Sequence, residues 1–164
     1  MEGDLTQTAY HEAGHAVMAR IIQWEYRFVT IRPGDSCLGQ LALLPIPEEI
    51  KEAWDCESFS SPLEMKWAAQ KILLCLSGTV SEQIAEYLPD EEFWNDETCL
   101  AYDIATSSGI WLQRAEGGAI FTGDAAVRKL LVRHWPEVEL LAAELLKRQE
   151  LKHSEVEEIF GMGY

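Results

Sequence analysis

Positive charge is scarce in this chain of 164 residues, where 13 Lys and Arg stand against 28 Asp and Glu and the formal net charge is −15. Binding to nucleic-acid phosphates needs clustered Lys and Arg, and so does docking on an anionic membrane. We therefore expect no nucleic-acid partner and no attachment to anionic lipid. The simplest consequence of the acidic excess is solubility through self-repulsion.

Long apolar runs are also missing. No stretch approaches the roughly 20 apolar residues that cross a bilayer, and the acidic start Met1-Glu2-Gly3-Asp4 lacks the apolar segment of a signal peptide. The four cysteines form no C-x-x-C pair, which argues against both a disulfide framework and a cysteine zinc site. These absences predict a cytoplasmic protein without a membrane span, whose cysteines are reduced and mostly buried.

The composition that remains, 48% hydrophobic and 25% charged, is ordinary for a globular protein, and the length predicts a single domain over residues 1–164. Segments 26–31 and 38–44 have the composition of strands and flank the turn residues Pro33-Gly34-Asp35. Elsewhere apolar residues recur at helical spacing. The pattern predicts a mainly α fold, an array of about six helices with a small two-stranded β-ribbon. The helices are expected at about 4–23, 65–88, 98–114, 123–134, 136–149 and 154–159.

The segment His11-Glu12-Ala13-Gly14-His15 is an H-E-x-x-H motif within the first predicted helix. Residues four apart lie on one face of a helix, so His11 and His15 can bind one zinc ion at about 2.0–2.1 Å each. Glu12 lies about 100° around the helix and can act as general base on water in the metal's open position. Gly14 costs about 1 kcal/mol in a helix interior relative to Ala, which indicates close approach by another backbone or by substrate.

Two histidines leave a catalytic zinc one protein ligand short. A third histidine in the H-E-x-x-H-x-x-G-x-x-H form is excluded, because Met18 and Ile21 occupy those positions. The serious candidates are carboxylates: Glu82 and Glu86, which lie four residues apart, and Asp103, a charged residue among apolar ones. From the residues alone, the third ligand stays open between them.

The run Ala9–Val17 resembles the active-site helix of the FtsH family, the ATP-dependent zinc metalloproteases. Other segments resemble parts of that family in the same order. Val29–Gly34 and Leu38–Pro45 are similar to its ribbon, Leu76–Ile84 to its L-G-G-R-x-A-E-E-I segment, and Asp103–Ser108 to its D-L-x-x-A-T segment. The resemblance spans nearly all of the chain.

This resemblance implies that His11, His15 and Asp103 bind Zn2+ and that Glu12 is the catalytic base. It implies that Glu82 hydrogen-bonds a ligand histidine, with Glu82 also the alternative third ligand. It further implies an FtsH-peptidase-like domain, mostly helical, with the β-ribbon beside the metal site.

The chain also departs from the family. No G-x-x-x-x-G-K-[ST] motif of an ATPase module occurs, Ser77 and Thr79 replace a glycine and an arginine, and the stretch before Asp103 is acidic and contains Trp94. These changes question hexameric assembly and processive degradation but leave the three expected ligands in place.

We therefore expect a hydrolase, an ATP-independent zinc metallopeptidase that cleaves peptides or unfolded proteins. The alternative is a catalytically silent FtsH-peptidase-like scaffold or regulatory protein, whose acidic loops would suit a basic partner. Assembly into a homo-oligomer and association with a separately encoded ATPase both stay open.

Overall fold

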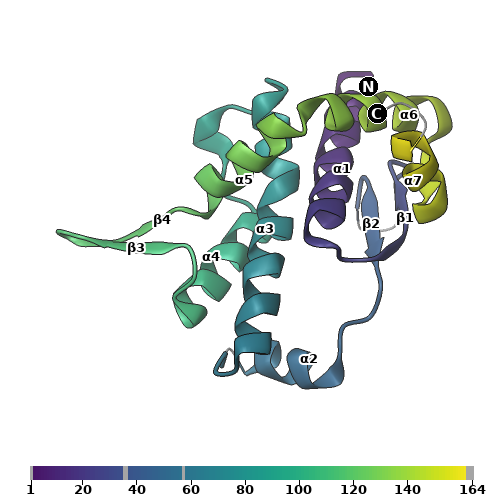
Figure 1. The fold of residues 1–164 in the computed structure, drawn as a ribbon. Helices are drawn as coiled ribbons and strands as arrows, with labels where there is room; N and C mark the ends of the chain where they lie inside the picture. The colour runs from purple at the N-terminus through teal and green to yellow at the C-terminus, as the bar shows by residue number, and fades with distance from the viewer. Residues whose placement is uncertain (1, 35–36, 57, 162–164) are drawn as a thin grey trace.

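The computed structural model describes residues 2–34, 37–56 and 58–161. Over these ranges the chain is mainly helical, as predicted, with two small antiparallel sheets (Figure 1). The helices are α1 (Glu2–Ile22), α2 (Glu48–Asp55), α3 (Pro62–Ile84), α4 (Asp96–Ser108), α5 (Gly123–Arg133), α6 (Trp135–Arg148), α7 (His153–Gly161) and the 3-10 turn η1 (Asp90–Glu92). The strands are β1 (Tyr26–Thr30), β2 (Gln40–Leu43), β3 (Leu112–Ala115), β4 (Gly118–Phe121) and β5 (Glu150–Lys152).

The long helices α1 and α3 form the centre of the fold, with α4 and α5 packed on α3 and α6 packed on α1. Helix α3 begins at a capping box, in which Ser61 and Glu64 satisfy each other's backbone N–H groups, with Pro62 in its first turn. The core combines fully buried residues of both helices, among them Val17, Met18, Ile72 and Leu76. None of the described helices combines the length and the apolar character needed to cross a membrane.

Gly14 is where α1 and α3 come closest. A Cβ atom at this position would lie 2.5 Å from the Ser81 Cβ atom and 2.6 Å from the Ser77 carbonyl oxygen. The predicted close approach of another backbone is therefore confirmed, and the other backbone is that of α3. Ser81 also donates a 2.7 Å hydrogen bond to the Tyr10 carbonyl oxygen across the same interface.

Gly14→Ala is expected to destabilise the protein by about 1–3 kcal/mol, the usual range for forcing an extra group into a packed interior. Urea unfolding followed by circular dichroism measures the change. Gly161→Ala is the matched control, because a Cβ atom at this helical glycine meets nothing within 4 Å. Equal stability of the Gly14→Ala variant and the wild type would show that α1 and α3 can separate without cost.

The predicted ribbon is confirmed and is one strand wider than expected. β1 pairs antiparallel with β2, with Val29 opposite Leu41, and on its other side with β5, where Val29 lies opposite Leu151. The sheet order β2-β1-β5 leaves the outer edge of β2 without a strand partner in the part of the chain that the structure describes. That free edge faces the site described below.

The predicted helix over 98–114 is wrong at its C-terminal end. α4 stops at Ser108, because Gly109 adopts a left-handed conformation with a φ angle of 77°. The chain then forms the β3–β4 hairpin, which turns at Gly117 and Gly118, both with positive φ angles. Figure 1 shows this hairpin projecting away from the helices.

The cysteines differ from expectation in their burial. Only Cys75 is buried, whereas Cys37, Cys56 and Cys99 are exposed, and all four are free thiols. Cys75 lies on the inward face of α3. The exposed three lie in connections or on the outer face of a helix, where the apolar pattern gave no reason to bury them.

Candidate metal centre

Two imidazoles and one carboxylate converge between α1 and α4. The Nε2 atoms of His11 and His15 lie 3.0 Å apart. The Glu97 Oε2 atom lies 3.1 Å from the His15 Nε2 atom and 3.3 Å from the His11 Nε2 atom. Within the described ranges this is the group of three His, Cys, Asp or Glu side chains whose ligand atoms are close enough to share an ion.

His15 is oriented by α3. Its Nδ1 atom lies 2.8 Å from the Leu74 carbonyl oxygen and 3.0 Å from the Ser77 hydroxyl, which itself donates to the Leu74 carbonyl. A carbonyl oxygen only accepts, so Nδ1 carries the proton and the lone pair of the neutral ring lies on Nε2. The backbone of α3 therefore presents His15 Nε2 to the other two groups.

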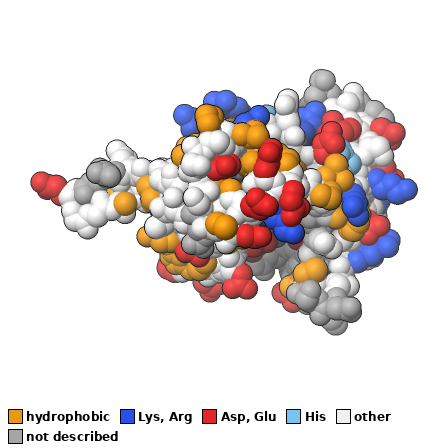
Figure 2. Space-filling model, turned by 90° about the horizontal axis from the view of Figure 1, so that it is seen from below, with side chains coloured by type: hydrophobic (Ala, Val, Ile, Leu, Met, Phe, Trp, Pro, Cys, Tyr) orange, Lys and Arg blue, Asp and Glu red, His pale blue; other side chains and the backbone are white. Residues whose placement is uncertain are grey.

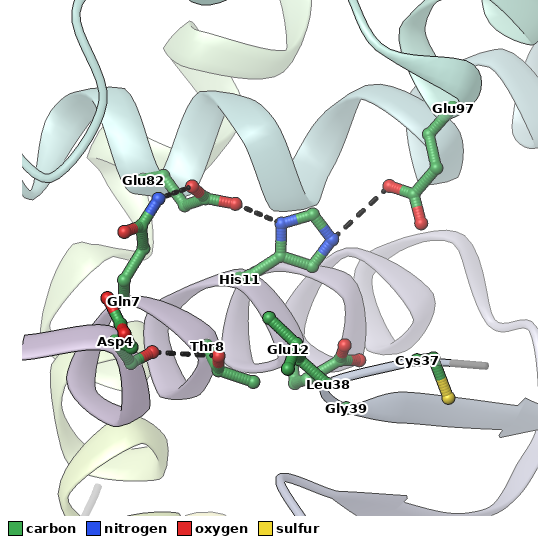
Figure 3. Close-up of a pocket in the computed structure, with 10 residues that line it drawn as sticks. All are labelled: Asp4, Gln7, Thr8, His11, Glu12, Cys37, Leu38, Gly39, Glu82 and Glu97. Atoms are coloured by element: carbon green, nitrogen blue, oxygen red, sulfur yellow. Dashed lines mark hydrogen bonds and ion pairs between the residues drawn. The ribbon is translucent and has the colours of Figure 1, made fainter. Parts of the chain in front are cut away.

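His11 is oriented in the same way by a carboxylate. Its Nδ1 atom hydrogen-bonds the Glu82 Oε1 atom, and the Gln7 side-chain amide donates a 2.6 Å hydrogen bond to the Glu82 Oε2 atom (Figure 3). Glu82 thus lies on the opposite side of the His11 ring from Nε2 and Glu97. This is the arrangement by which an outer carboxylate fixes the tautomer of a metal-binding histidine.

Gly78 makes room for both rings on the surface of α3. A Cβ atom at this position would lie 2.5 Å from the His11 Nε2 atom and 2.6 Å from the His15 Nε2 atom. Any side chain here would collide with the two nitrogens that face Glu97. The glycine in the middle of a buried helix is therefore explained by the site and not by helix formation.

The carboxylates of Glu82 and Glu97 favour a positive charge between the two imidazoles. Burial lowers the pKa of His11, but hydrogen bonds to Glu82 and Glu97 outweigh burial and raise the pKa to about 10. Burial raises the pKa of Glu97, but the adjacent His15 and His11 outweigh it and hold that pKa well below its usual range. The arrangement stabilises a cation between the imidazoles, whether a proton or a metal ion.

Glu12 lies beside this group without belonging to it. Its side chain is 5% exposed, and its Oε2 atom has no hydrogen-bond partner among the described residues. Burial raises its pKa, opposed by the nearby His15 and His11. A Cβ atom at Gly39 would lie 2.8 Å from the Glu12 Cγ atom, so the glycine lets the connection before β2 close over Glu12. An unpartnered buried carboxylate oxygen calls for a water or substrate group.

Asp103, predicted as the third ligand, lies elsewhere. It is exposed and lines a separate cavity of about 90 Å3 with Trp54 and Phe59. Asp103 is six residues beyond Glu97 on α4, about 9 Å along the helix at 1.5 Å per residue. The carboxylate that the structure places beside the two histidines is that of Glu97. Glu86 is exposed beyond the end of α3 and is not in the group either.

The sequence around Glu97 contains a helix-capping pattern that differs from the predicted helix start at Thr98. The Asn95 side chain accepts hydrogen bonds from the backbone N–H groups of Glu97 and Thr98, and the Thr98 hydroxyl accepts from the Asn95 N–H group. This capping box begins α4 at Asp96 and puts Glu97 in its first turn. The predicted start at Thr98 had left Glu97 in an acidic loop.

The group fits a zinc ion in ligand type and spacing. Two imidazole nitrogens and one carboxylate oxygen are a ligand set of catalytic zinc, which keeps a fourth position open. Zinc bonds of about 2.0–2.2 Å in tetrahedral geometry separate the ligand atoms by roughly 3.3 Å. The three separations of 3.0, 3.1 and 3.3 Å between the atoms are close to that value.

Comparison with known protein families found none that matches this chain, and comparison with curated proteins found no match either. The geometry of the site therefore carries the functional argument.

Proposed function

We propose that this chain is a zinc-dependent endopeptidase that hydrolyses peptide bonds of unfolded proteins or peptides without an ATPase of its own. The observation that carries the proposal is the convergence of His11, His15 and Glu97 on one point, with the unpartnered carboxylate of Glu12 beside it. The FtsH-like character of the domain belongs to the same proposal and is supported by the ordered sequence resemblance.

Each residue of the site has a separate role in the proposed hydrolysis. His11, His15 and Glu97 would hold the ion, which supplies a Lewis acid and lowers the pKa of water from 15.7 to about 7. Glu12 takes the proton of the attacking water and returns it to the leaving amine. Burial raises the pKa of Glu12, which makes the carboxylate a stronger base than an exposed glutamate. Glu82 and the α3 backbone keep both imidazoles in the tautomer that binding requires.

The cleft around the site favours cleavage within a chain over cleavage at its end. A cavity of about 350 Å3 lies on the His11 side and another of about 450 Å3 on the His15 side. Glu12 and Glu97 line both cavities, so space for substrate continues on either side of the reacting groups. Gln40, Leu41 and Leu43 of β2 line the second cavity. An extended peptide can pair with the free edge of that strand.

Removal of the metal tests the proposal. The purified chain is expected to hydrolyse unfolded casein, to lose this activity on dialysis against 1,10-phenanthroline, and to regain it with one equivalent of zinc. Fragments are measured by gel electrophoresis and zinc by atomic absorption. Hydrolysis that survives complete removal of zinc would contradict the proposal. A chain that binds zinc tightly and hydrolyses nothing would favour the scaffold alternative.

A further inference from the structure

Four aromatic rings contact one another in a continuous row near the candidate metal centre, and the two middle ones, Trp94 and Tyr102, are exposed, whereas Phe93 and Phe121 are half-buried. The rings of Phe93 and Trp94 have centroids 5.0 Å apart, those of Trp94 and Tyr102 5.7 Å, and those of Tyr102 and Phe121 5.7 Å, each pair edge to face. Trp94 is 57% exposed and Tyr102 41%. We call these four residues the aromatic row. Trp94 lies three residues before Glu97 in the sequence.

Carboxylates border the aromatic row. Asp90, Glu91 and Glu92 of η1 immediately precede Phe93, Asp96 follows Trp94 by two residues, and Asp103 is next to Tyr102. All five are exposed, and the Asp90 Oδ1 atom lies 3.8 Å from the Arg128 Nη2 atom. Between Lys71 and Arg114 the chain has eight Asp and Glu but no Lys or Arg. Figure 2 shows hydrophobic and acidic side chains interspersed on the body beside the projecting hairpin.

Exposed Trp and Tyr rings with carboxylates nearby are suited to binding cationic side chains. Arg and Lys side chains bind the faces of Trp and Tyr, for about 0.5–1 kcal/mol at exposed sites, and their charge is attracted by the carboxylates. A second copy of this chain is disfavoured, because each copy carries a formal net charge of −15. Nucleic acid is disfavoured for the same reason.

We propose that the aromatic row binds cationic segments of the substrate, so that the enzyme selects unfolded chains with Arg or Lys near the cleaved bond. This inference rests on the proposed peptidase function and names its substrate class. Tyr102 lies five residues after Glu97 on α4, about 7.5 Å along the helix and about 140° around it. Since an extended chain advances about 3.3 Å per residue, the cations belong a few residues from the cleaved bond.

The test uses the full chain with Glu12→Gln, which binds substrate without turning it over. Three fluorescein-labelled peptides share one apolar core and differ in a flanking block of four Arg, four Gln or four Glu. Fluorescence anisotropy is expected to show the Arg peptide binding at least about tenfold more tightly than the Gln peptide. The Glu peptide is expected to bind most weakly, and added salt should reduce the Arg advantage.

Further substitutions in the Glu12→Gln protein test whether the aromatic row causes the tighter binding of the Arg peptide. Trp94→Ala combined with Tyr102→Ala is expected to remove most of the Arg advantage and to leave binding of the Gln peptide unchanged. Leu146→Ala is the matched control, since Leu146 is a 37% exposed apolar residue on α6. Equal affinity for the Arg and Gln peptides, or an Arg advantage that survives loss of both rings, would overturn the inference.

The same peptides separate this inference from the proposed function. With the wild-type zinc protein, cleavage of all three at equal KM would uphold the peptidase and reject the role of the row. If the wild type cleaves none of them, the peptidase fails, and the anisotropy measurements still decide whether the row binds cations.

Discussion

Glu12→Gln is expected to lower the rate of casein hydrolysis by about 100- to 10,000-fold, the usual contribution of a positioned general base. The amide has nearly the shape of the carboxylate but cannot accept the proton of water. Because Glu12 lies beside the His11, His15 and Glu97 group and is not one of its members, bound zinc should persist. Hydrolysis and zinc content are measured on the same preparation.

Gln7→Ala supplies a useful comparison, because Gln7 lies five residues before Glu12 on α1 and its side-chain amide donates a hydrogen bond to Glu82. It should affect zinc affinity more than the hydrolysis rate at saturating zinc. Unchanged turnover in Glu12→Gln would refute the role of Glu12. Loss of zinc in that variant would mean that Glu12 is itself a ligand.

Glu97→Ala is expected to reduce zinc affinity by more than the 10- to 100-fold that is typical of losing a group that only orients a ligand. It removes the carboxylate oxygen that lies 3.1 Å from the His15 Nε2 atom and 3.3 Å from the His11 Nε2 atom. Asp103→Ala, on the same helix, should leave zinc bound, because that side chain lies in a separate exposed place. Competition with a chromogenic chelator measures both affinities.

The zinc affinity of Glu82→Ala is expected to lie between those of Asp103→Ala and Glu97→Ala. This substitution removes the hydrogen-bond partner of the His11 Nδ1 atom but no proposed ligand. The order of zinc affinity is therefore expected to be wild type and Asp103→Ala, then Glu82→Ala, then Glu97→Ala. Loss of zinc with Asp103→Ala and retention with Glu97→Ala would show that Asp103, and not Glu97, is the third ligand.

Local patterns were enough to predict how the two histidines lie relative to each other. The spacing of His11 and His15 within a helix brought their nitrogens together, and Gly14 indicated a close helix contact that the structure contains. The β1–β2 ribbon followed from its composition and turn residues. These features depend on residues close together in the chain, where periodicity and turn chemistry apply directly.

The features that escaped prediction depend on distant parts of the chain or on one helix boundary. β5 pairs with β1 across more than a hundred residues and is only three residues long, too short for a pattern. Asp103 was predicted as the third ligand because the family resemblance implies it, and Glu97 was not a candidate because the predicted helix began at Thr98, past the capping residue Asn95. Glu97 and Asp103 lie six residues apart on α4, which is almost two turns of helix.

The glycines at positions 14 and 78 have a joint consequence. Both lie at the boundary between α1 and α3, one removing bulk where the helices touch and the other where the imidazoles rest. The distance between α1 and α3 therefore affects both the packing of the two helices and the position of the imidazoles that would bind an ion. A substitution that widens this gap is therefore expected to lower both the free energy of unfolding and the affinity for the proposed ion.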